Sequence, residues 1–275
     1  MSDRKTTRNC SRKFQSFLLR FGFLCVALAT TAHPQGLKLD AVSVKKSLLR
    51  VQQGEFDAGD VHRLAEAGEV QAISALRQQF AAKRETMLKE FIASALIRLG
   101  EKDLIYWDYL ARNARSAVEN DAPSIFLLDS QGNVMPGNGK FSPEFTEWAK
   151  AHKLDANSAA QTQLYELPAY VSFLGRTGDH RALPVLRKGL ASRNVNIQLE
   201  AARGLAKLQD KDSIPSIIDA CKKAPAGLDS MIARALVFFD DPRAQSAAEK
   251  FIPNKQTLEE LRRRSREKGA DPFLY

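Results

Sequence analysis

The sequence is poor in cysteine and histidine, the residue types that most often build metal centres and covalent chemistry. It has 3 cysteines and 4 histidines in 275 residues. The histidines, His33, His62, His152 and His180, show no i, i+3 or i, i+4 pairing, so no zinc-type cluster is predicted. A phosphate loop, a dinucleotide fingerprint and a Gly-x-Ser-x-Gly elbow are also absent. The sequence therefore predicts no metal, no cofactor and no catalytic residue.

Long apolar runs are scarce as well. Residues 1–20 carry six basic residues and one acid, and residues 21–32, "FGFLCVALATTA", carry no charge. This run is shorter than the roughly 20 residues that a membrane-spanning helix needs. A basic segment, a short apolar segment and small residues predict a signal peptide cleaved near Ala32, and hence export to the periplasm or the cell exterior. A retained anchor, a buried N-terminal helix and a lipoprotein at Cys25 are the alternatives, although bulky Phe23 and Leu24 disfavour the last.

Loss of residues 1–32 changes the charge and the cysteine content. The net charge falls from +9 to +4, because 35 basic residues then face 31 acidic ones. A basic surface for nucleic acid thus loses its main support, and no nucleic-acid partner is predicted. Cys221 is left alone, which excludes an internal disulfide. The mature chain is also expected to contain no integral membrane span.

What the sequence does contain is a repeat. Two sets of residues return every 31 positions: Leu174, Leu205 and Leu236, and Asp179, Asp210 and Asp241. Between them, apolar residues recur every three or four positions, which is typical of one face of a helix. Pro184 and Pro215 fit the first turns of helices, and the recurring aspartates fit turns and helix caps. Each copy is therefore predicted to be two antiparallel helices that become stable only by stacking on the next pair.

These stretches resemble a known family. "GDHRALPVLRKGL…IQLEAARGLAKL" and "QDKDSIPSIIDAC…MIARALVFF" are similar to the short HEAT-like repeats named after phycobilisome lyases. The resemblance covers residues 164–252 well and 60–118 moderately, where Leu-x-x-x-Gly-Glu recurs from Leu64 and Leu96. It implies an all-α solenoid of helix pairs, and the lyase association suggests Cys221 as a bilin attachment point. The apolar stripe that contains Cys221 instead indicates a buried thiol.

An insert interrupts the repeats. "SIFLLDSQGNVM" predicts two short strands with a turn at 130–133, and "SPEFTEWAKAHKL" predicts a helix that starts at Ser142 and Pro143. The candidate partner-binding residues are the two tryptophans and two neighbouring aromatics: Tyr106, Trp107, Phe145 and Trp148. They are interpreted as an aromatic patch that recognises a protein partner. Simple packing of these aromatics is the alternative.

The chain is accordingly divided into six parts. These are a signal peptide at 1–32, an N-terminal segment at 33–59, HEAT-like helices at 60–118, a β-hairpin-plus-helix insert at 119–157, HEAT-like repeats at 158–252, and a basic tail or capping helix at 253–275. In the tail, Glu259–Arg263 and Glu260–Arg264 have the i, i+4 spacing of helix ion pairs.

The resulting prediction of function is an exported, non-catalytic scaffold that binds a protein partner of unknown identity. Two alternatives stay open. One is an envelope-associated adaptor whose basic tail binds anionic surfaces. The other is an enzyme, lyase-like, with a site at the insert that uses Cys221 or His152.

Overall fold

The computed structural model describes residues 40–83, 87–125, 127–128, 134–135, 140–225, 227–267 and 269–274. Residues 39–273 form one compact unit. The predicted signal peptide lies outside the described residues, as does the predicted turn at 130–133. Among the residues that are described, no helix is long and apolar enough to cross a membrane.

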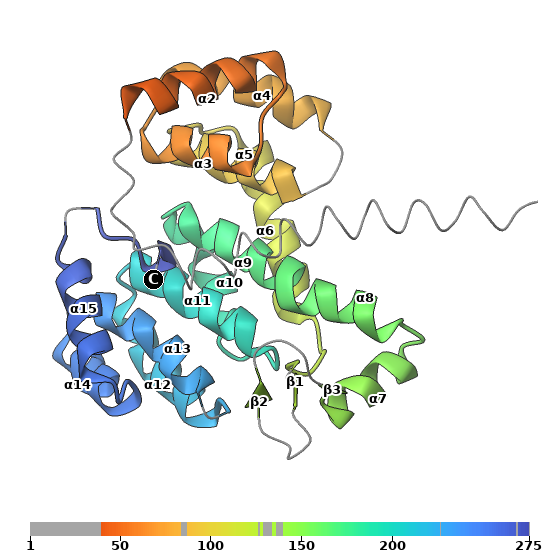
Figure 1. Ribbon diagram of the computed structural model, residues 1–275, viewed down its shortest axis with the longest axis vertical. Helices are drawn as coiled ribbons and strands as arrows, with labels where there is room; N and C mark the ends of the chain where they lie inside the picture. The colour runs from red at the N-terminus through yellow and green to blue at the C-terminus, as the bar shows by residue number, and fades with distance from the viewer. Residues whose placement is uncertain are drawn as a thin grey trace, which may run out of the picture. The chain divides into compact units, whose positions relative to one another are not determined.

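The described chain consists mainly of helices that pack in pairs, which confirms the all-α prediction (Figure 1). We call the members of a pair the first and the second helix. The pairs are α2 (Ala41–Gln53) with α3 (Ala58–Glu66), α4 (Ile73–Ala82) with α5 (Met87–Arg98), α6 (Leu104–Glu119) with α9 (Leu167–Arg176), α10 (Leu183–Gly189) with α11 (Val195–Lys207), and α12 (Ile214–Lys223) with α13 (Leu228–Ala233). The 3₁₀ helix η5 (Arg234–Phe238) continues α13, and α14 (Pro242–Phe251) and α15 (Lys255–Ser265) follow.

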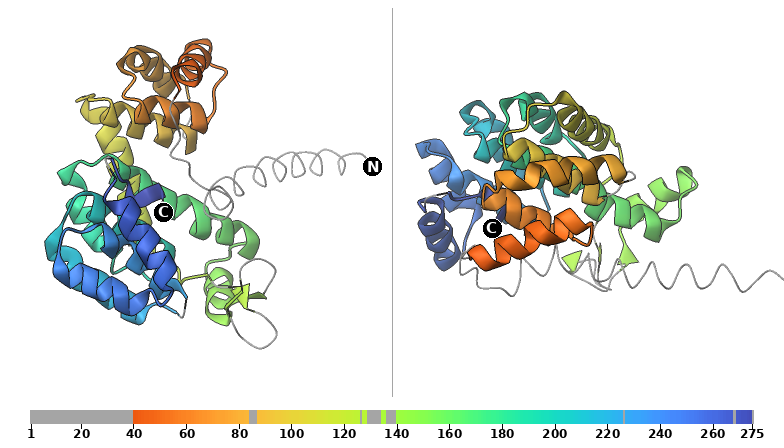
Figure 2. Two further views of the ribbon diagram at one scale, coloured as in Figure 1. Left: turned by 60° about the vertical axis from the view of Figure 1, so that its left-hand side comes forward. Right: turned by 90° about the horizontal axis from the view of Figure 1, so that it is seen from above.

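The second helices pack against one another in sequence order. Contacts run from α3 to α5, then to α9, α11 and η5, and finally to α15 (Figure 2 shows the stack from two further sides). Each of the first five contributes one leucine that has no solvent exposure: Leu64, Leu96, Leu174, Leu205 and Leu236. The residues that recur in the sequence are thus the ones that neighbouring pairs bury together, as stacking of individually unstable pairs requires.

Similar turns join successive pairs. The second helix ends at a residue with left-handed backbone, where glycine is favoured: Gly68 (φ 65°), Gly100 (φ 95°), Gly178 (φ 69°) and the non-glycine Gln209 (φ 53°). An acidic residue follows each of them. Asp179 and Asp241 cap the next helix by accepting from the backbone N–H of Arg181 and Arg243, as predicted.

Asp210 departs from the predicted capping role. Its carboxylate accepts no backbone cap bond and instead binds the Arg187 guanidinium, with Nε at 2.9 Å, and the Ser213 hydroxyl. Residue 212 is Asp, whereas the corresponding residues 181 and 243 are Arg. The arginine that pairs with Asp210 therefore comes from α10 of the previous pair.

Helical pairing starts earlier than residue 60. The segment predicted as 33–59 contains all of α2 and the first residues of α3. Asp40 and Asp57 cap these two helices. The buried Asp60 carboxylate accepts a hydrogen bond of 2.8 Å from the Ser47 hydroxyl of α2. Helix α2 leaves Val42 and Leu49 exposed.

The insert lies inside one helix pair and not between two arrays. Helices α6 and α9 pack directly against each other, although 47 residues separate them in the chain. Between them lie β1 (Leu127–Leu128), β2 (Val134–Met135), β3 (Lys140–Phe141), α7 (Pro143–Ala151), α8 (Ala156–Gln161) and the π-helical segment η2 (Thr162–Glu166). Ser142 caps α7 as predicted. The strands have two residues each, in the order β2-β1-β3, and a hairpin with its turn stays a prediction.

Candidate binding face on the second helices

One side of the second helices points away from the first helices. On α11, Ala201 faces α10, because a Cβ at Gly189 would lie 2.9 Å from its Cβ. Arg203 is two residues further on, about 200° around the helix, and therefore lies on the opposite side. We call this side the second-helix face. Its charged residues are Glu66, Arg98, Arg176, Glu200, Arg203, Lys207 and Arg234.

Four of these residues stand two positions after a buried leucine: Glu66, Arg98, Arg176 and Lys207. Because the helices stack in register, neighbouring members of this set approach one another. Nη2 of Arg98 lies 2.6 Å from Oε1 of Glu66, and the two side chains are only 15% and 28% exposed. The repeat therefore places charged side chains in a row along the stack.

A small cavity with both apolar and polar lining lies between α3, α5 and α9. His62, Arg98 and Arg176 line it together with Ser94 and two phenylalanines, Phe91 and Phe173. Burial, and then the charge of Arg176, lowers the pKa of His62. The cavity measures about 10 Å³, which is room for one water molecule at most. It is too small for a substrate.

The chain's own tail lies on the second-helix face at α9 and α11. The Asp271 carboxylate binds Nζ of Lys207 at 3.0 Å, and Arg176 donates to the Phe273 carbonyl at 3.3 Å. The Arg176 guanidinium also lies over the Phe273 ring, 4.7 Å from its centroid. Burial alone would raise the pKa of Asp271, but Lys207 and Arg176 outweigh it and lower that pKa.

This docking depends on two glycines where α9 crosses α11. A Cβ at Gly175 would lie 2.8 Å from the Phe273 ring and 3.0 Å from the Gly204 Cα. Only glycine permits this approach of the two backbones and the ring. The sequence predicts a basic tail or capping helix at 253–275. Helix α15 is present with the predicted Arg264–Glu260 pair, but Arg263 pairs with Glu260 and Glu267 and not with Glu259.

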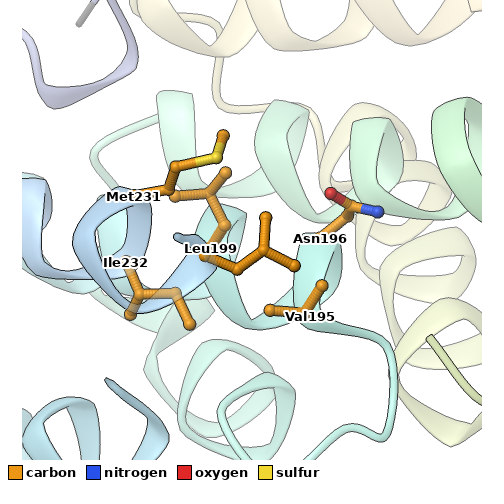
Figure 3. A pocket seen from close by; sticks show the side chains of 6 residues that line it. Val195, Asn196, Leu199, Met231 and Ile232 are labelled. Atoms are coloured by element: carbon orange, nitrogen blue, oxygen red, sulfur yellow. The ribbon is translucent and has the colours of Figure 1, made fainter. Parts of the chain in front are cut away.

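A shallow apolar depression, which has no room for even one water molecule and is called the groove below, lies one pair further along, between α11 and α13. Val195, Asn196, Leu199, Leu228, Met231 and Ile232 line it (Figure 3). Met231 is 36% exposed, and its side chain lies beside that of Leu199 in Figure 3. Arg203 follows Leu199 by four residues on α11, and Arg234, the first residue of η5, follows Met231 by three. We call the groove residues the apolar end of this region, and the two arginines that adjoin them in the chain its basic end.

The aromatic residues predicted as a partner-binding patch do not come together. Tyr106 and Trp107 are buried on α6, with 5% and 6% exposure. Tyr106 packs edge-on against Phe80 at 4.9 Å between centroids, and the Arg181 guanidinium lies 4.3 Å above the Trp107 ring. About 18 Å of helix separates Trp107 from the end of α6, where the insert begins. Closeness in sequence to the insert was therefore misleading.

Phe145 and Trp148 belong to a small core of the insert itself. Phe145 has no exposure and stacks on Trp148 at 5.8 Å. Its buried neighbours are Ile125, Ala159 and Ala160. Trp148 is half-buried and donates its ring N–H to Asp121 at 3.3 Å. Packing explains Tyr106, Trp107 and Phe145, whereas Trp148 keeps a partly accessible ring.

A buried polar network, missed at the sequence level, holds the insert to the repeats. The Asn194 side chain caps α11 and donates to the backbone carbonyl of Gln163 at 2.8 Å. Gln163 lies in the π-helical segment and donates to Asn120 at 3.0 Å. π-helical turns often mark such special positions. Asn194 begins a helix by the ordinary capping rule, but no sequence signal indicates its contact with a residue 31 positions earlier.

The two residues of the enzyme alternative lie on different elements. Cys221 is 1% exposed on α12, and burial raises the pKa of its thiol to about 12. His152 follows α7, is exposed, and has its Nδ1 2.8 Å from the Trp148 carbonyl. In the part of the chain that the structure describes, no three His, Cys, Asp or Glu side chains are grouped to hold a metal ion.

Comparison with known proteins agrees with this architecture. The family model described as PBS lyase HEAT-like repeat matches residues 197–223. The matched stretch runs from α11 through α12, which is the second helix of one pair and the first helix of the next. No curated protein matches the chain.

Proposed function

We propose that this chain is a non-catalytic scaffold that binds a protein partner on its second-helix face. The observation that carries the proposal is the register of the stack, which brings equivalent side chains of α5, α9, α11 and η5 onto one surface. Five basic residues, an apolar groove and a docked segment of the chain's own tail all lie there. HEAT-like repeats generally mediate protein binding, and the match at 197–223 includes α11, which contributes to this surface.

Site-specific photo-crosslinking tests the surface. A photoreactive amino acid is placed at Met231 on the second-helix face or at Lys222, which is exposed on the first helix α12. Cells that produce the full chain are irradiated, and adducts are identified by mass spectrometry. We expect a discrete partner adduct from position 231 and none from position 222. Equal capture from both positions, or none from 231 and other second-helix positions, contradicts the proposal.

We also propose export through a signal peptide at residues 1–32, with the scaffold acting in the periplasm or outside the cell. The charge pattern of residues 1–32 supports this. Fractionation followed by N-terminal mass analysis tests it. The expected product begins at His33 in the exported fraction. A chain that keeps residues 1–32 in the membrane fraction supports the retained anchor instead.

The insert, with its expected hairpin, its helix and the half-exposed Trp148, is proposed as a second binding element of the scaffold, alongside the second-helix face.

The alternative of a basic tail that binds anionic surfaces is less well supported. Arg262, Arg263 and Arg264 all bind carboxylates of Glu249, Glu260 or Glu267. Sedimentation with anionic vesicles, with and without residues 255–275, separates that adaptor from a soluble scaffold.

A further inference from the structure

We infer that the groove between α11 and α13–η5 binds a partner segment in which a large apolar side chain is followed by acidic residues. This inference rests on the proposed scaffold function and specifies the partner's chemistry. The apolar side chain would lie over the exposed Met231, and the carboxylates would pair with Arg234 and Arg203.

The apolar end of the groove leaves apolar surface exposed to solvent. Leu199 and Ile232 form its floor with 7% and 0% exposure, while Met231 is 36% exposed at its rim. Methionine side chains are flexible and adapt to different apolar partners. Covering these side chains removes apolar surface from water, which favours binding.

The basic end has a cation without a counter-charge. The Arg234 side chain is partly buried, and no carboxylate lies within ion-pair distance of it among the described residues. Burial and the neighbouring Arg203 both lower the pKa of Arg234, and its guanidinium stays charged at neutral pH without a carboxylate partner among the described residues. Arg203 already binds Glu200 at 2.7 Å. An incoming carboxylate at Arg234 would therefore relieve a repulsion as well as form an ion pair.

The chain's own tail shows the same chemistry one pair earlier on this face. There an acidic residue, Asp271, pairs with Lys207, and an apolar residue, Phe273, packs against the helices and beneath Arg176. Arg203 and Arg234 occupy equivalent positions on α11 and η5, two residues before Leu205 and Leu236. A face that binds an acidic and aromatic segment at α9–α11 thus continues into a groove of similar character at α11–α13.

A peptide selection tests the inference on the full chain. A phage library of random dodecapeptides is panned against the protein, and the enriched peptides are synthesised with a fluorescent label. We expect them to share a large apolar residue followed within a few positions by Asp or Glu. Fluorescence anisotropy should show about tenfold or greater loss of affinity for Arg234→Ala and for Met231→Asp. Arg234→Lys should retain part of the affinity because it keeps the charge.

Arg115→Ala on the exposed side of α6 is the matched control and should not change affinity. Thermal unfolding confirms that each variant is folded, and Arg234→Gln replaces Arg234→Ala if the latter is not. Enriched peptides without acidic residues, no enrichment, or peptides that bind both variants normally all overturn the inference. A partner still captured from the second-helix face by a chain that carries Arg234→Ala leaves the proposed function standing and overturns this inference alone.

Discussion

At the scale of single residues, Asn194 shows how one buried amide can join two parts of the chain. Its side chain caps α11 through the N–H of Asn196 and at the same time binds the Gln163 carbonyl. Both functions are needed because buried backbone groups must have partners. The residue is 1% exposed, so water cannot substitute for it.

We expect Asn194→Ala to destabilise the protein by about 2–3 kcal/mol, because it removes a cap and leaves a buried carbonyl unsatisfied. Asn254→Ala is the control: Asn254 caps α15 in the same way but is exposed. Its loss should cost about 1 kcal/mol. Urea unfolding of both variants measures the difference. Equal losses would mean that the network around Gln163 contributes nothing.

Cys221 is expected to be unreactive in the folded chain. Its pKa is raised from 9.0 to about 12, which leaves about 10³-fold less thiolate than an exposed cysteine has at neutral pH. In a chain with Cys10→Ser and Cys25→Ser, thiol labelling should be slow in buffer and complete in guanidinium chloride. Rapid labelling of the native form would restore Cys221 as a nucleophile or attachment point.

At the scale of secondary-structure elements, two glycines allow α9 and α11 to cross closely. Gly175 and Gly204 face each other, and a Cβ at Gly204 would lie 3.1 Å from the Gly175 Cα and 2.9 Å from a Leu186 methyl. The tail's Phe273 completes this contact from the other side. These two glycines therefore allow the two backbones to approach closely.

Gly204→Ala should therefore destabilise the fold by about 1–2 kcal/mol, although alanine favours helices by up to about 1 kcal/mol over glycine. The α9 backbone at Gly175 cannot move aside as a flexible side chain could. Gly59→Ala in α3 is the control, since its Cβ would approach only the Asp57 carboxylate. Thermal unfolding of the two variants measures the difference in stability. A stabilised Gly204→Ala chain would show that the helices can move apart freely.

The sequence allowed the repeating elements to be predicted but not the contacts that occur once. Leu174, Leu205 and Leu236 recur at a fixed period, and burial against neighbouring pairs imposes that period directly. Asn194 with Gln163, and Asp271 with Lys207, join distant residues a single time, so no periodic signal marks them. The predicted aromatic patch is not formed for a related reason. Trp107 lies within α6 and Trp148 lies in the insert after it, so the length of α6 separates the two tryptophans in space.

At the scale of the whole molecule, acidification should reduce stability in two steps. His62 has a lowered pKa in the fold, so below its ordinary value of 6.5 the unfolded chain takes up a proton that the folded chain does not. The carboxylates of Asp179, Asp210, Asp241 and Asp271 also have lowered pKa values, near 2 for Asp241. Their contribution is present above the ordinary value of 3.8 and is lost as pH falls through the folded pKa.

Urea unfolding between pH 7 and pH 2 measures both steps. We expect the midpoint to fall first below about pH 6.5 and again below about pH 4. His62→Gln should remove the first decline and leave the second, while Asp271→Asn should reduce the second. A midpoint that rises between pH 6.5 and pH 5 would contradict the direction inferred for His62.

The insert between α6 and α9 has a consequence for how such a chain can change. The insert begins after α6 and ends before α9, which pack as one helix pair. The contacts of α5 with α9 and of α9 with α11 are formed despite the insert. Lengthening a connection costs little entropy once its ends are fixed. The connection between α6 and α9 is thus a position where other sequence can replace residues of the insert. New binding specificity can arise there while the stacked helix pairs stay unchanged.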